Sequence, residues 1–469
     1  MPSLWIVWII VQEYGYSLIA SSKLHAEEGC HQAAANRTLA TGTPFPHDDY
    51  QERYRPASKP QQYIDYKLHY GLRYNPPPHR NVTQERERKK LLLPPKQTTY
   101  EPPSPPLLSV FHIISFVNGP CVPRGQPDNA TAWAGVCYHE QECSLLNGTP
   151  MDSCAGGFGV CCVFQFGCDG RTEQNVSYFH SPNYPSAATE ALPCGFTLLL
   201  QRTVRQVLLE FQFFELQPPQ LGNCIEDQFI ISVQNDQRTY PVLCGINTGQ
   251  HMYLDIDRAY SHRLYLSAVF NSKQPRAFLV KITQLKTHRA PASCLQFHDG
   301  VSGVLKSFNY DNSSVLVTNR KASYFNNLNY AICIRRHTMF CNVVLTNIDT
   351  INGKENTFQL VNIAEGIKLS VASVKHMIFS LCLHIYTDGS SLIPPNQAGV
   401  EVFSCPDDFI AIDFIRLCGE RLNDGSLVAD ASINKPVTYS SSGPIVVAVR
   451  TDQSIVGRGF KLSYTQLVS

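Results

Sequence analysis

Six cysteines fall within 42 residues of this sequence, and thiols at this density could bind a metal ion, exchange electrons or crosslink the chain. The densest stretch is CAGGFGVCCVF, in which Cys161 and Cys162 are adjacent. Zinc sites ask for CxxC-type pairs, which this block lacks, and the side chains of a vicinal pair rarely reach one ion together. Because a block this short cannot rest on a hydrophobic core alone, we predict that disulfides hold it, each contributing about 2–4 kcal/mol. The six positions are Cys121, Cys137, Cys143, Cys154, Cys161 and Cys162.

A second candidate for chemistry is HEQEC, residues 139–143, which begins like the HExxH helix of zinc proteases. A cysteine stands where the second histidine should be, so the motif fails. The sequence also lacks a GDSG or GxSxG setting for a serine nucleophile, and it has neither the Rossmann nor the Walker glycine pattern. We therefore predict that the protein is not an enzyme.

The charges of the chain nearly balance, with 39 Lys and Arg against 38 Asp and Glu and a net charge of +1. No net field would draw the chain to nucleic acid, so we exclude nucleic acid as a partner. Residues 4–11 form an apolar run of the length of a signal-peptide core, and we expect a signal peptide over residues 1–20. No apolar run reaches the roughly 18 residues that a spanning helix needs, so we expect no integral membrane segment.

Cysteines and glycosylation motifs agree on an oxidising compartment. The chain has 17 cysteines, and all except Cys30 come from Cys121 onward, in spacings typical of disulfide frameworks. N-x-S/T sequons accompany them, and the asparagines of such sequons are glycosylated in the secretory pathway. We therefore expect an extracellular glycoprotein. The sequon asparagines are Asn36, Asn81, Asn129, Asn147, Asn175 and Asn312.

The elements that must position these residues are strands. Residues 21–118 lose periodicity and hold many of the 31 prolines, so we expect a disordered arm rich in Pro and Tyr. After Cys121, short runs of β-formers alternate with Gly, Pro, Asn and Asp, which predicts a mainly β fold of antiparallel sandwiches. Predicted strands include residues 206–216, 227–233, 262–270, 341–348 and 444–450.

The second half of the chain contains an internal repeat. Three motifs recur in the same order, at offsets of 181, 174 and 182 residues. Such nearly constant offsets imply two copies of one domain. The motif pairs are CIED (224–227) with CPDD (405–408), Cys244-Gly245 with Cys418-Gly419, and FLVKITQL (278–285) with FKLSYTQL (460–467).

The six-cysteine block, at residues 119–163, resembles the clip domain. This small three-disulfide module is found ahead of arthropod serine proteases, and its last two cysteines are adjacent. The resemblance covers only the six cysteines, and the residues that follow do not lead into a protease. It implies the pairs Cys121–Cys161, Cys137–Cys154 and Cys143–Cys162.

Residues 164–286 look like a CUB domain, an extracellular β-sandwich of jelly-roll type with two disulfides. The signature SPNYP, the strand FQFFELQ before the third cysteine, an Asp three residues after it, a Cys-Gly pair and the closing FLVKITQL stand in the expected order. The resemblance implies the pairs Cys168–Cys194 and Cys224–Cys244.

Residues 292–469 resemble a longer and divergent CUB domain. Its end carries CPDDFIAI and a Cys-Gly pair, whereas GVSGVLKSFNY stands in place of SPNYP. We expect an insertion around residues 335–400. The order of the modules resembles that of a group of secreted arthropod CUB-domain proteins. We pair Cys294 with Cys333, Cys341 with Cys382, and Cys405 with Cys418.

Many CUB domains bind Ca²⁺ through a Glu before the third cysteine, the Asp three residues after it and an Asp in a later loop, since Ca²⁺ requires oxygen ligands. In the family the bound ion orients an acidic group toward a lysine of the partner. The first copy has Asp227, but Gln217 stands at the Glu position and Lys273 near the later Asp. We therefore expect no calcium in the first copy.

The second copy keeps two of the three acids. Asp408 and Asp452 form a weak Ca²⁺ candidate, and Glu401 is only a guess at the third ligand. The alternative, in which Asp408 caps a turn and Asp452 is solvated, stands equally.

The sequence thus predicts a secreted, non-catalytic adhesion or scaffold protein that binds an extracellular protein through its CUB domains. Two alternatives stay open. One is an accessory regulator of an extracellular serine-protease cascade, docking through the clip-like block. The other is a structural component of extracellular matrix or cuticle, which would rest on the arm rich in Pro and Tyr.

Overall fold

A computed structural model describes eight stretches of the chain, all within one compact unit. The expected signal peptide and residues 21–114 of the expected arm lie outside these stretches, as do Cys30, Cys382 and the sequon asparagines Asn36, Asn81 and Asn129. None of the helices in the described stretches has the length and apolar character that a membrane crossing requires. The described residues are 115–124, 133–257, 261–312, 314–316, 322–348, 358–363, 391–440 and 443–468.

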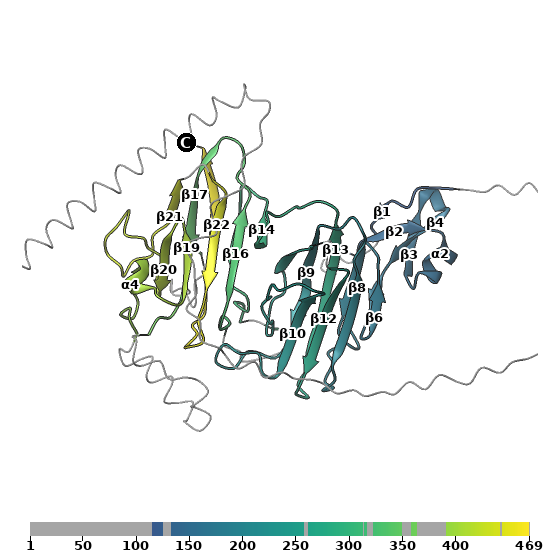
Figure 1. Cartoon of the computed structure of the whole chain (residues 1–469), viewed down its shortest axis with the longest axis horizontal. Coiled ribbons are helices and arrows are strands. Elements are labelled where there is room, and N and C mark those ends of the chain that lie inside the picture. The colour runs from purple at the N-terminus through teal and green to yellow at the C-terminus, as the bar shows by residue number, and fades with distance from the viewer. Residues whose placement is uncertain are drawn as a thin grey trace, which may run out of the picture. The chain divides into compact units, whose positions relative to one another are not determined.

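The cysteine-rich block is a small four-stranded sheet with one short helix (Figure 1). The structure joins Cys121 to Cys161, Cys137 to Cys154 and Cys143 to Cys162. The bond between Cys143 and Cys162 is fully buried against Phe164, so it takes the place of a core. The sheet order is β1 (Pro120–Cys121), β2 (Gly135–Tyr138), β4 (Gly159–Val163) and β3 (Thr149–Cys154), with α2 at Glu140–Leu145 and the 3₁₀ turn η2 at Ala155–Gly157.

Glycines let the chain turn between these crosslinks. Gly156 and Gly157 have φ of 67° and 95°, a region that side chains disfavour. A Cβ on Gly159 would stand 3.0 Å from the sulfurs of Cys137 and Cys154. The stretch between the cysteines therefore needs these glycines for its backbone path.

The first sandwich consists of a four-stranded and a five-stranded sheet. Strands β8, β10 and β12 alternate buried residues with more accessible ones, and β10 has the bounds that the sequence predicts. The four-stranded sheet has the order β10 (Asp227–Val233), β12 (Arg263–Phe270), β8 (Cys194–Leu199) and β6 (Gly170–Thr172). The five-stranded sheet has the order β11 (His251–Asp255), β9 (Gln206–Glu215), β13 (Ala277–Leu285), β7 (Val176–His180) and β5 (Gln165–Phe166).

The core of the first sandwich is aromatic. Phe229 and Phe278, one from each sheet, pack edge to face with ring centroids 5.5 Å apart. Phe179 stacks on Phe196 with centroids 5.2 Å apart, again across the two sheets. Rings in these arrangements contribute beyond their buried area, so they fix how the sheets face each other.

The second sandwich pairs a six-stranded sheet with a four-stranded sheet. A one-turn helix, α4 (Glu401–Ser404), follows β18. The six-stranded sheet has the order β14 (Cys294–His298), β16 (Asn329–Ile334), β22 (Ile445–Arg450), β19 (Phe409–Ile412), β20 (Ile415–Gly419) and β18 (Ala398–Val400). The four-stranded sheet has the order β15 (Ser302–Lys306), β23 (Lys461–Val468), β17 (Phe340–Asn347) and β21 (Val437–Ser440).

The repeat read from the sequence has a structural counterpart. β13 and β23 carry the two copies of the closing motif, and each pairs with a long central strand, β9 or β17. β10 begins at Asp227, and β19 begins directly after Asp408, the corresponding aspartate of the second copy. The predicted mainly β fold with two sandwiches is confirmed.

Each sandwich contains disulfides of its own. Four of the bonds predicted for these sandwiches join described residues, with Cα atoms 4.6 to 5.8 Å apart. Cys341 is also disulfide-bonded. Its proposed partner Cys382 lies outside the described residues, so the pair Cys341–Cys382 stays a prediction. The four bonds are Cys168–Cys194, Cys224–Cys244, Cys294–Cys333 and Cys405–Cys418.

Candidate functional site

The first acidic site lies at the start of β10, where Asp227 is completely buried. Its Oδ2 accepts a hydrogen bond from the backbone N–H of Gln217 at 2.9 Å. The same oxygen forms an ion pair with Nε of Arg276 at 2.8 Å, and both side chains are 0% exposed. A carboxylate that resembles a metal ligand in the sequence therefore has a guanidinium as its counterion.

The Arg276 guanidinium makes further hydrogen bonds and a ring contact. Its Nη2 donates to the carbonyl oxygen and hydroxyl of Ser272 at 2.8 and 2.6 Å, and its Nη1 donates to the carbonyl of Glu190 at 3.3 Å. The guanidinium lies 4.7 Å from the ring centroid of Phe270. Burial raises the pKa of Asp227, and the hydrogen bond and charge of Arg276 oppose that rise.

The residues around Asp227 do not fit a calcium site, because the cation position is filled by a side chain of the chain itself. The sequence indicated Lys273 as the added cation. Lys273 is exposed, and Arg276, three residues later, is the cation that reaches the carboxylate. Sequence reasoning missed Arg276 because an arginine directly before a strand looks like a solvated strand end.

The second acidic site centres on Asp408, which is 1% exposed. The hydroxyl of Tyr324 donates to its Oδ2 at 2.5 Å, and the backbone N–H of Asp452 donates to its Oδ1 at 2.7 Å. Asn362 holds the backbone, since its Nδ2 donates to the Asp408 carbonyl and its Oδ1 accepts from the Asp408 N–H. Burial raises the pKa of Asp408 to about 7, and the Tyr324 hydrogen bond limits the rise.

The structure brings Asp408 and Asp452 together, but through the backbone of Asp452. The Asp452 carboxylate turns back on its own loop, where Oδ1 accepts from the N–H and hydroxyl of Ser454 at 2.7 and 2.5 Å. Glu401 is exposed at the start of α4. In the described stretches no group of three or more His, Cys, Asp or Glu side chains could hold a metal.

Ca²⁺ takes six to eight oxygen ligands from carboxylates, carbonyls and water. Both Asp408 oxygens already accept hydrogen bonds, and one Asp452 oxygen caps a turn. The residues present therefore fit a structural hydrogen-bond network better than a calcium site. Sequence reasoning missed Tyr324 and Asn362, which lie 84 and 46 residues before Asp408.

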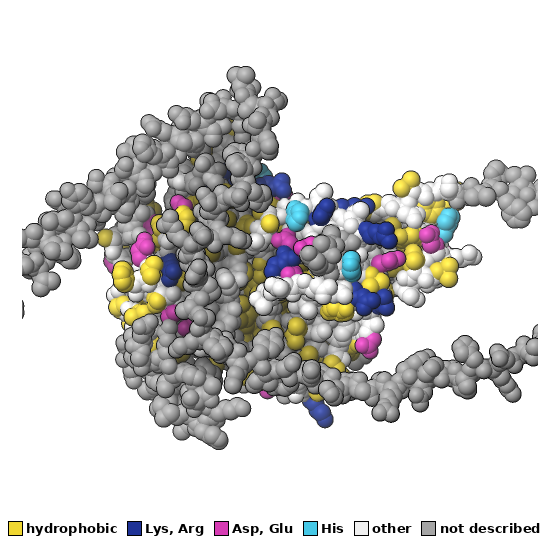
Figure 2. Space-filling model, viewed as in Figure 1, with side chains coloured by type: hydrophobic (Ala, Val, Ile, Leu, Met, Phe, Trp, Pro, Cys, Tyr) yellow, Lys and Arg dark blue, Asp and Glu magenta, His cyan; other side chains and the backbone are white. Residues whose placement is uncertain are grey.

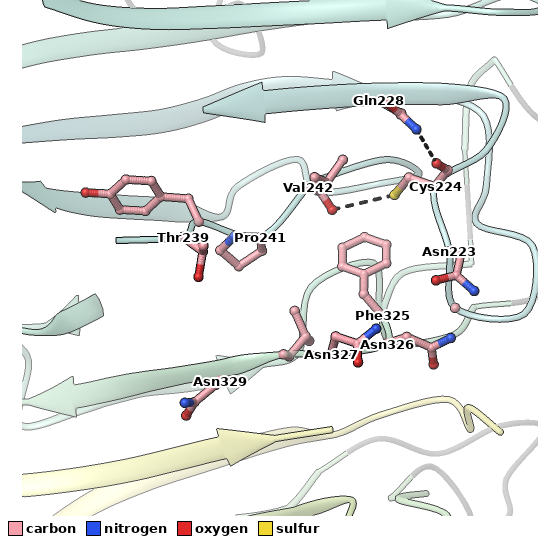
Figure 3. A pocket seen from close by; sticks show the side chains of 13 residues that line it. Asn223, Cys224, Gln228, Thr239, Pro241, Val242, Phe325, Asn326, Asn327 and Asn329 are labelled. Atoms are coloured by element: carbon pink, nitrogen blue, oxygen red, sulfur yellow. Dashed lines mark hydrogen bonds between the residues drawn. The ribbon is translucent and has the colours of Figure 1, made fainter. Parts of the chain in front are cut away.

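The two sandwiches contact each other beside a hollow of about 350 Å³ (Figure 3). Phe325 points from the second sandwich toward Val242 of the first. The Asn326 N–H donates to the Gly222 carbonyl at 3.0 Å, and its Nδ2 donates to the Leu221 carbonyl at 2.8 Å. Gly222 has φ of 78°, and a Cβ there would stand 2.5 Å from Asn326 Oδ1, so this contact requires glycine.

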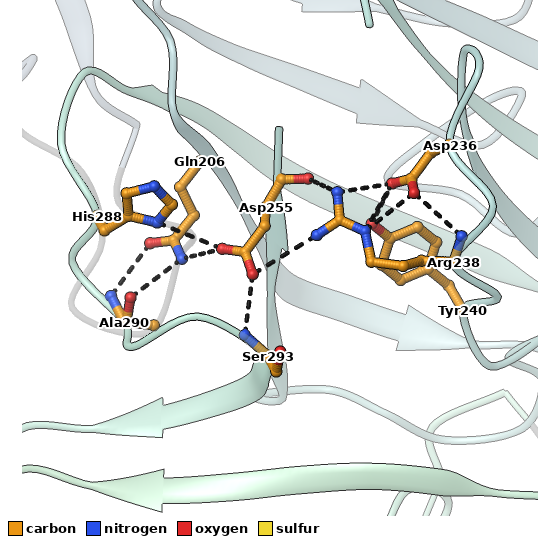
Figure 4. Close-up of polar contacts among 8 residues, drawn as sticks. All are labelled: Gln206, Asp236, Arg238, Tyr240, Asp255, His288, Ala290 and Ser293. Atoms are coloured by element: carbon orange, nitrogen blue, oxygen red, sulfur yellow. Dashed lines mark hydrogen bonds and ion pairs between the residues drawn. The ribbon is translucent and has the colours of Figure 1, made fainter. Parts of the chain in front are cut away.

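A polar network fixes the segment between the sandwiches, with Asp255 at its centre (Figure 4). Asp255 Oδ1 accepts from Gln206 Nε2 at 2.9 Å, and its Oδ2 accepts from the Ser293 N–H at 3.0 Å. Gln206 Oε1 in turn accepts from the Ala290 N–H at 3.1 Å. The ends of β9 and β11 thus hold the linker by its backbone.

Arginine and histidine complete this network. Nη2 of Arg238 donates to the Asp255 carbonyl at 2.7 Å, and its Nε donates to the Asp236 carboxylate. His288 Nδ1 lies 3.4 Å from Asp255 Oδ1. The Arg238 pair lowers the pKa of Asp236 against the opposing effect of burial. Because these hydrogen bonds join strands of the first sandwich to the backbone of the linker, the linker is held in one conformation.

The second sandwich exposes an apolar tip, defined here as Val402, Phe403 and Phe414. Phe403 and Phe414 are 96% and 92% exposed, and Val402 is 52% exposed. Val402 and Phe403 lie on α4, which packs against β20, and Phe414 lies in the turn that enters β20. Hydrophobic side chains gather over this end of the sandwich in Figure 2.

The turn at the apolar tip is strained. Asp413 and Phe414 have φ of 48° and 72°, the pattern of a type I′ hairpin turn, in which Gly is the favoured residue at the second position. A bulky residue there is an outlier, and such strain clusters at functional sites. The tip also has an acidic rim, because Glu401 and Asp413 are exposed beside it.

Three sequon asparagines lie in described stretches. Asn147, Asn175 and Asn312 are all exposed, as an attached glycan would require. Their modification stays a prediction.

Two family models match the chain. The model described as CUB domain matches residues 168–278, and the model described as animal CUB domain matches residues 291–467. No curated protein matches.

Three solved structures are similar to the chain at low identity. The CUB1-EGF-CUB2 domains of rat MASP-1 show 13% identity over 63% of this chain and 99% of that one, with a TM-score of 0.21. The CUB1-EGF-CUB2 domain of human MASP-1/3 shows 12% identity over 63% of this chain and 100% of that one, with a TM-score of 0.21. The full extracellular region of zebrafish Gpr126/Adgrg6 shows 12% identity over 64% of this chain and 34% of that one, with a TM-score of 0.22.

Proposed function

We propose that this chain, which carries two CUB domains, is a secreted, non-catalytic protein that binds another extracellular protein. CUB domains generally mediate protein–protein interaction. The observation that carries the proposal is the apolar tip of the second domain. Two phenylalanines more than 90% exposed at one end of a sandwich are the kind of feature that marks an interaction surface.

The chemistry of the tip indicates the chemistry of the partner. Buried aromatic anchors dominate binding energy at interfaces, and Phe403 and Phe414 each offer a whole ring. The exposed carboxylates of Glu401 and Asp413 flank them. The surface that fits is therefore an apolar pocket on another protein with lysine or arginine at its rim.

The test is a comparison of capture from the extracellular fluid of the source. The intact chain and the double variant Phe403→Ser/Phe414→Gly are immobilised at equal density, and the captured proteins are quantified. We expect the double variant to lose a partner that the wild-type chain retains, and Leu427→Ser to retain it. Leu427 is a matched control because it is 63% exposed in another loop.

Self-association is checked by light scattering of the same samples. If the wild-type chain dimerises and the double variant does not, the tip binds a second copy of this chain. If the double variant captures the same proteins as the wild-type chain in equal amounts, the tip is not the binding surface and the proposal fails.

A regulator of a serine-protease cascade is the second candidate. The three-disulfide block and its resemblance to the clip domain support this function. Such a regulator should associate with a protease and change the rate at which that protease is activated. A matrix or cuticle component would instead resist extraction and be crosslinked through its tyrosines.

A further inference from the structure

A second surface, separate from the apolar tip, is a hollow of about 780 Å³ in the second domain. We call it the basic cleft. Its walls are the linker residues 288–291, the turn 335–339 between β16 and β17 with the start of β17, and Phe297, Gly443 and Pro444. Both wall segments are rich in cations, reading HRAP and RRHTMF.

The charged residues that line the basic cleft are all basic. Arg289, Arg335 and Arg336 line it together with two histidines, and no aspartate or glutamate is among the described lining residues. Two acids beside the cleft are already engaged, since Asp299 pairs with Arg335 at 2.8 Å and Asp255 lies 3.4 Å from His288. No ion pair joins the exposed Arg289 side chain to a described residue, so its charge is available to a ligand.

Arg336 positions the turn and does not face the ligand. Its Nε donates to the Gly443 carbonyl at 2.9 Å, and its Nη1 donates to the Cys341 carbonyl at 2.7 Å and the Phe340 carbonyl at 3.2 Å. These bonds tie the turn to the segment before β22. The mouth of the cleft is therefore held in shape before any ligand arrives.

The floor and rim of the cleft are apolar. Phe297 and Ile334 are buried at the floor, and the Arg335 guanidinium lies 5.6 Å from the Phe297 ring centroid. At the rim, Met339 is 79% exposed and has φ of 76°. A turn with this φ favours glycine or asparagine, so the requirements of the turn do not explain a methionine there. Methionine is an adaptable apolar contact, which suits a binding rim.

We propose that the basic cleft binds an acidic peptide segment that carries an apolar side chain, contributed by a protein partner. Arginine recognises carboxylates through paired N–H donors, and Arg289 would meet the acidic side chains, with Arg335, which already pairs with Asp299, beside it. The apolar side chain would lie against Met339 and the floor. A sulfated glycan would satisfy the cations but would leave the apolar rim without a use, so the peptide is favoured.

The test measures binding of two fluorescein-labelled peptides to the full chain by fluorescence anisotropy. One peptide alternates glutamate and leucine, and the other is glutamate throughout. We expect the alternating peptide to bind the tighter of the two. Arg289→Glu should weaken both by about tenfold, while Arg171→Glu, a reversal at an exposed arginine of β6, should change neither.

Met339→Gly is the decisive variant. It should weaken the alternating peptide about threefold and leave the all-glutamate peptide unchanged, and its unfolding midpoint should not fall because glycine accepts φ of 76°. This result would separate a binding role from a structural one.

Three outcomes would overturn the proposal. Equal binding of the two peptides with displacement by a heparin fragment would identify a glycan site. Equal affinity of Arg289→Glu and the wild-type chain for the alternating peptide would place its binding site elsewhere. If the wild-type chain bound neither peptide, the proposal would be wrong. Because Phe403→Ser/Phe414→Gly should bind the alternating peptide normally, failure of the cleft and failure of the apolar tip remain distinguishable.

Discussion

Removing the Arg276 guanidinium tests the account of the first acidic site most directly. Arg276→Met keeps an unbranched apolar side chain in place but leaves Asp227 buried without its counterion. The Asp227 Oδ2 would keep only the Gln217 N–H, and its Oδ1 has no hydrogen-bond partner among the described residues even in the wild type. Breaking a buried ion pair by removing one partner costs about 3–5 kcal/mol, and we expect a loss of that size at neutral pH.

The loss should depend on pH with a definite sign. Without Arg276, burial would raise the pKa of Asp227 further, so the folded state would bind a proton that the unfolded state releases. Stability then falls as pH rises from the ordinary carboxyl pKa of about 4 toward the raised one. The variant should therefore be closest to wild type in acid and furthest from it above neutrality.

The assay is urea unfolding with the disulfides intact, followed by intrinsic fluorescence at an acidic and a neutral pH. Asp227→Leu/Arg276→Met should recover most of the stability, because replacing both charges by apolar groups removes the uncompensated one. Lys281→Met is the control, since the Lys281–Glu210 pair is partly exposed and is worth at most about 1 kcal/mol. A single variant as stable as the control, or a double variant as unstable as the single one, would refute the reasoning.

Three further predictions concern the second domain and the cysteine block. Because the pKa of Asp408 is raised to about 7, the wild-type domain should lose stability as pH rises from about 4 to 7, and Asp408→Asn should flatten that part of the profile in thermal unfolding. Adding Ca²⁺ or a chelator should leave the unfolding midpoint of the wild-type chain unchanged, and a rise with Ca²⁺ that Asp408→Asn abolishes would instead establish a calcium site. Disulfide mapping by mass spectrometry should find no free thiol at Cys161 or Cys162, and a free thiol at either would remove the clip-like pairing.

Sequence patterns predicted the strands well for a physical reason. Alternation of apolar and polar residues is a local property, so residues 227–233 identify β10 without knowledge of its neighbours. The cysteine spacing likewise carries its own information. The apolar tip was not predicted, because an exposed phenylalanine and a buried one look the same in a sequence. The exposure of Phe403 and Phe414, together with the turn geometry at Phe414, reveals it in the structure.

Local sequence patterns did not predict the partners of the two buried aspartates. The motif located Asp227 and Asp408, but the nature of each site is decided by residues far along the chain. Arg276 lies 49 residues from Asp227, and Tyr324 lies 84 residues from Asp408. Arg276 directly precedes a strand of one sheet, Asp227 begins a strand of the opposite sheet, and Tyr324 reaches Asp408 from a loop, so no spacing rule within a motif encodes these contacts.

The two copies of the domain therefore meet the same physical problem in different ways. A buried carboxylate needs compensation, and the first domain supplies a guanidinium at 2.8 Å while the second supplies a hydroxyl and a backbone N–H. The guanidinium of Arg276 opposes the rise that burial imposes on the pKa of Asp227. Neutral donors allow Asp408 to take up a proton near pH 7. Changes of pH near 7 should thus act on the second domain, which also carries the apolar tip and the basic cleft.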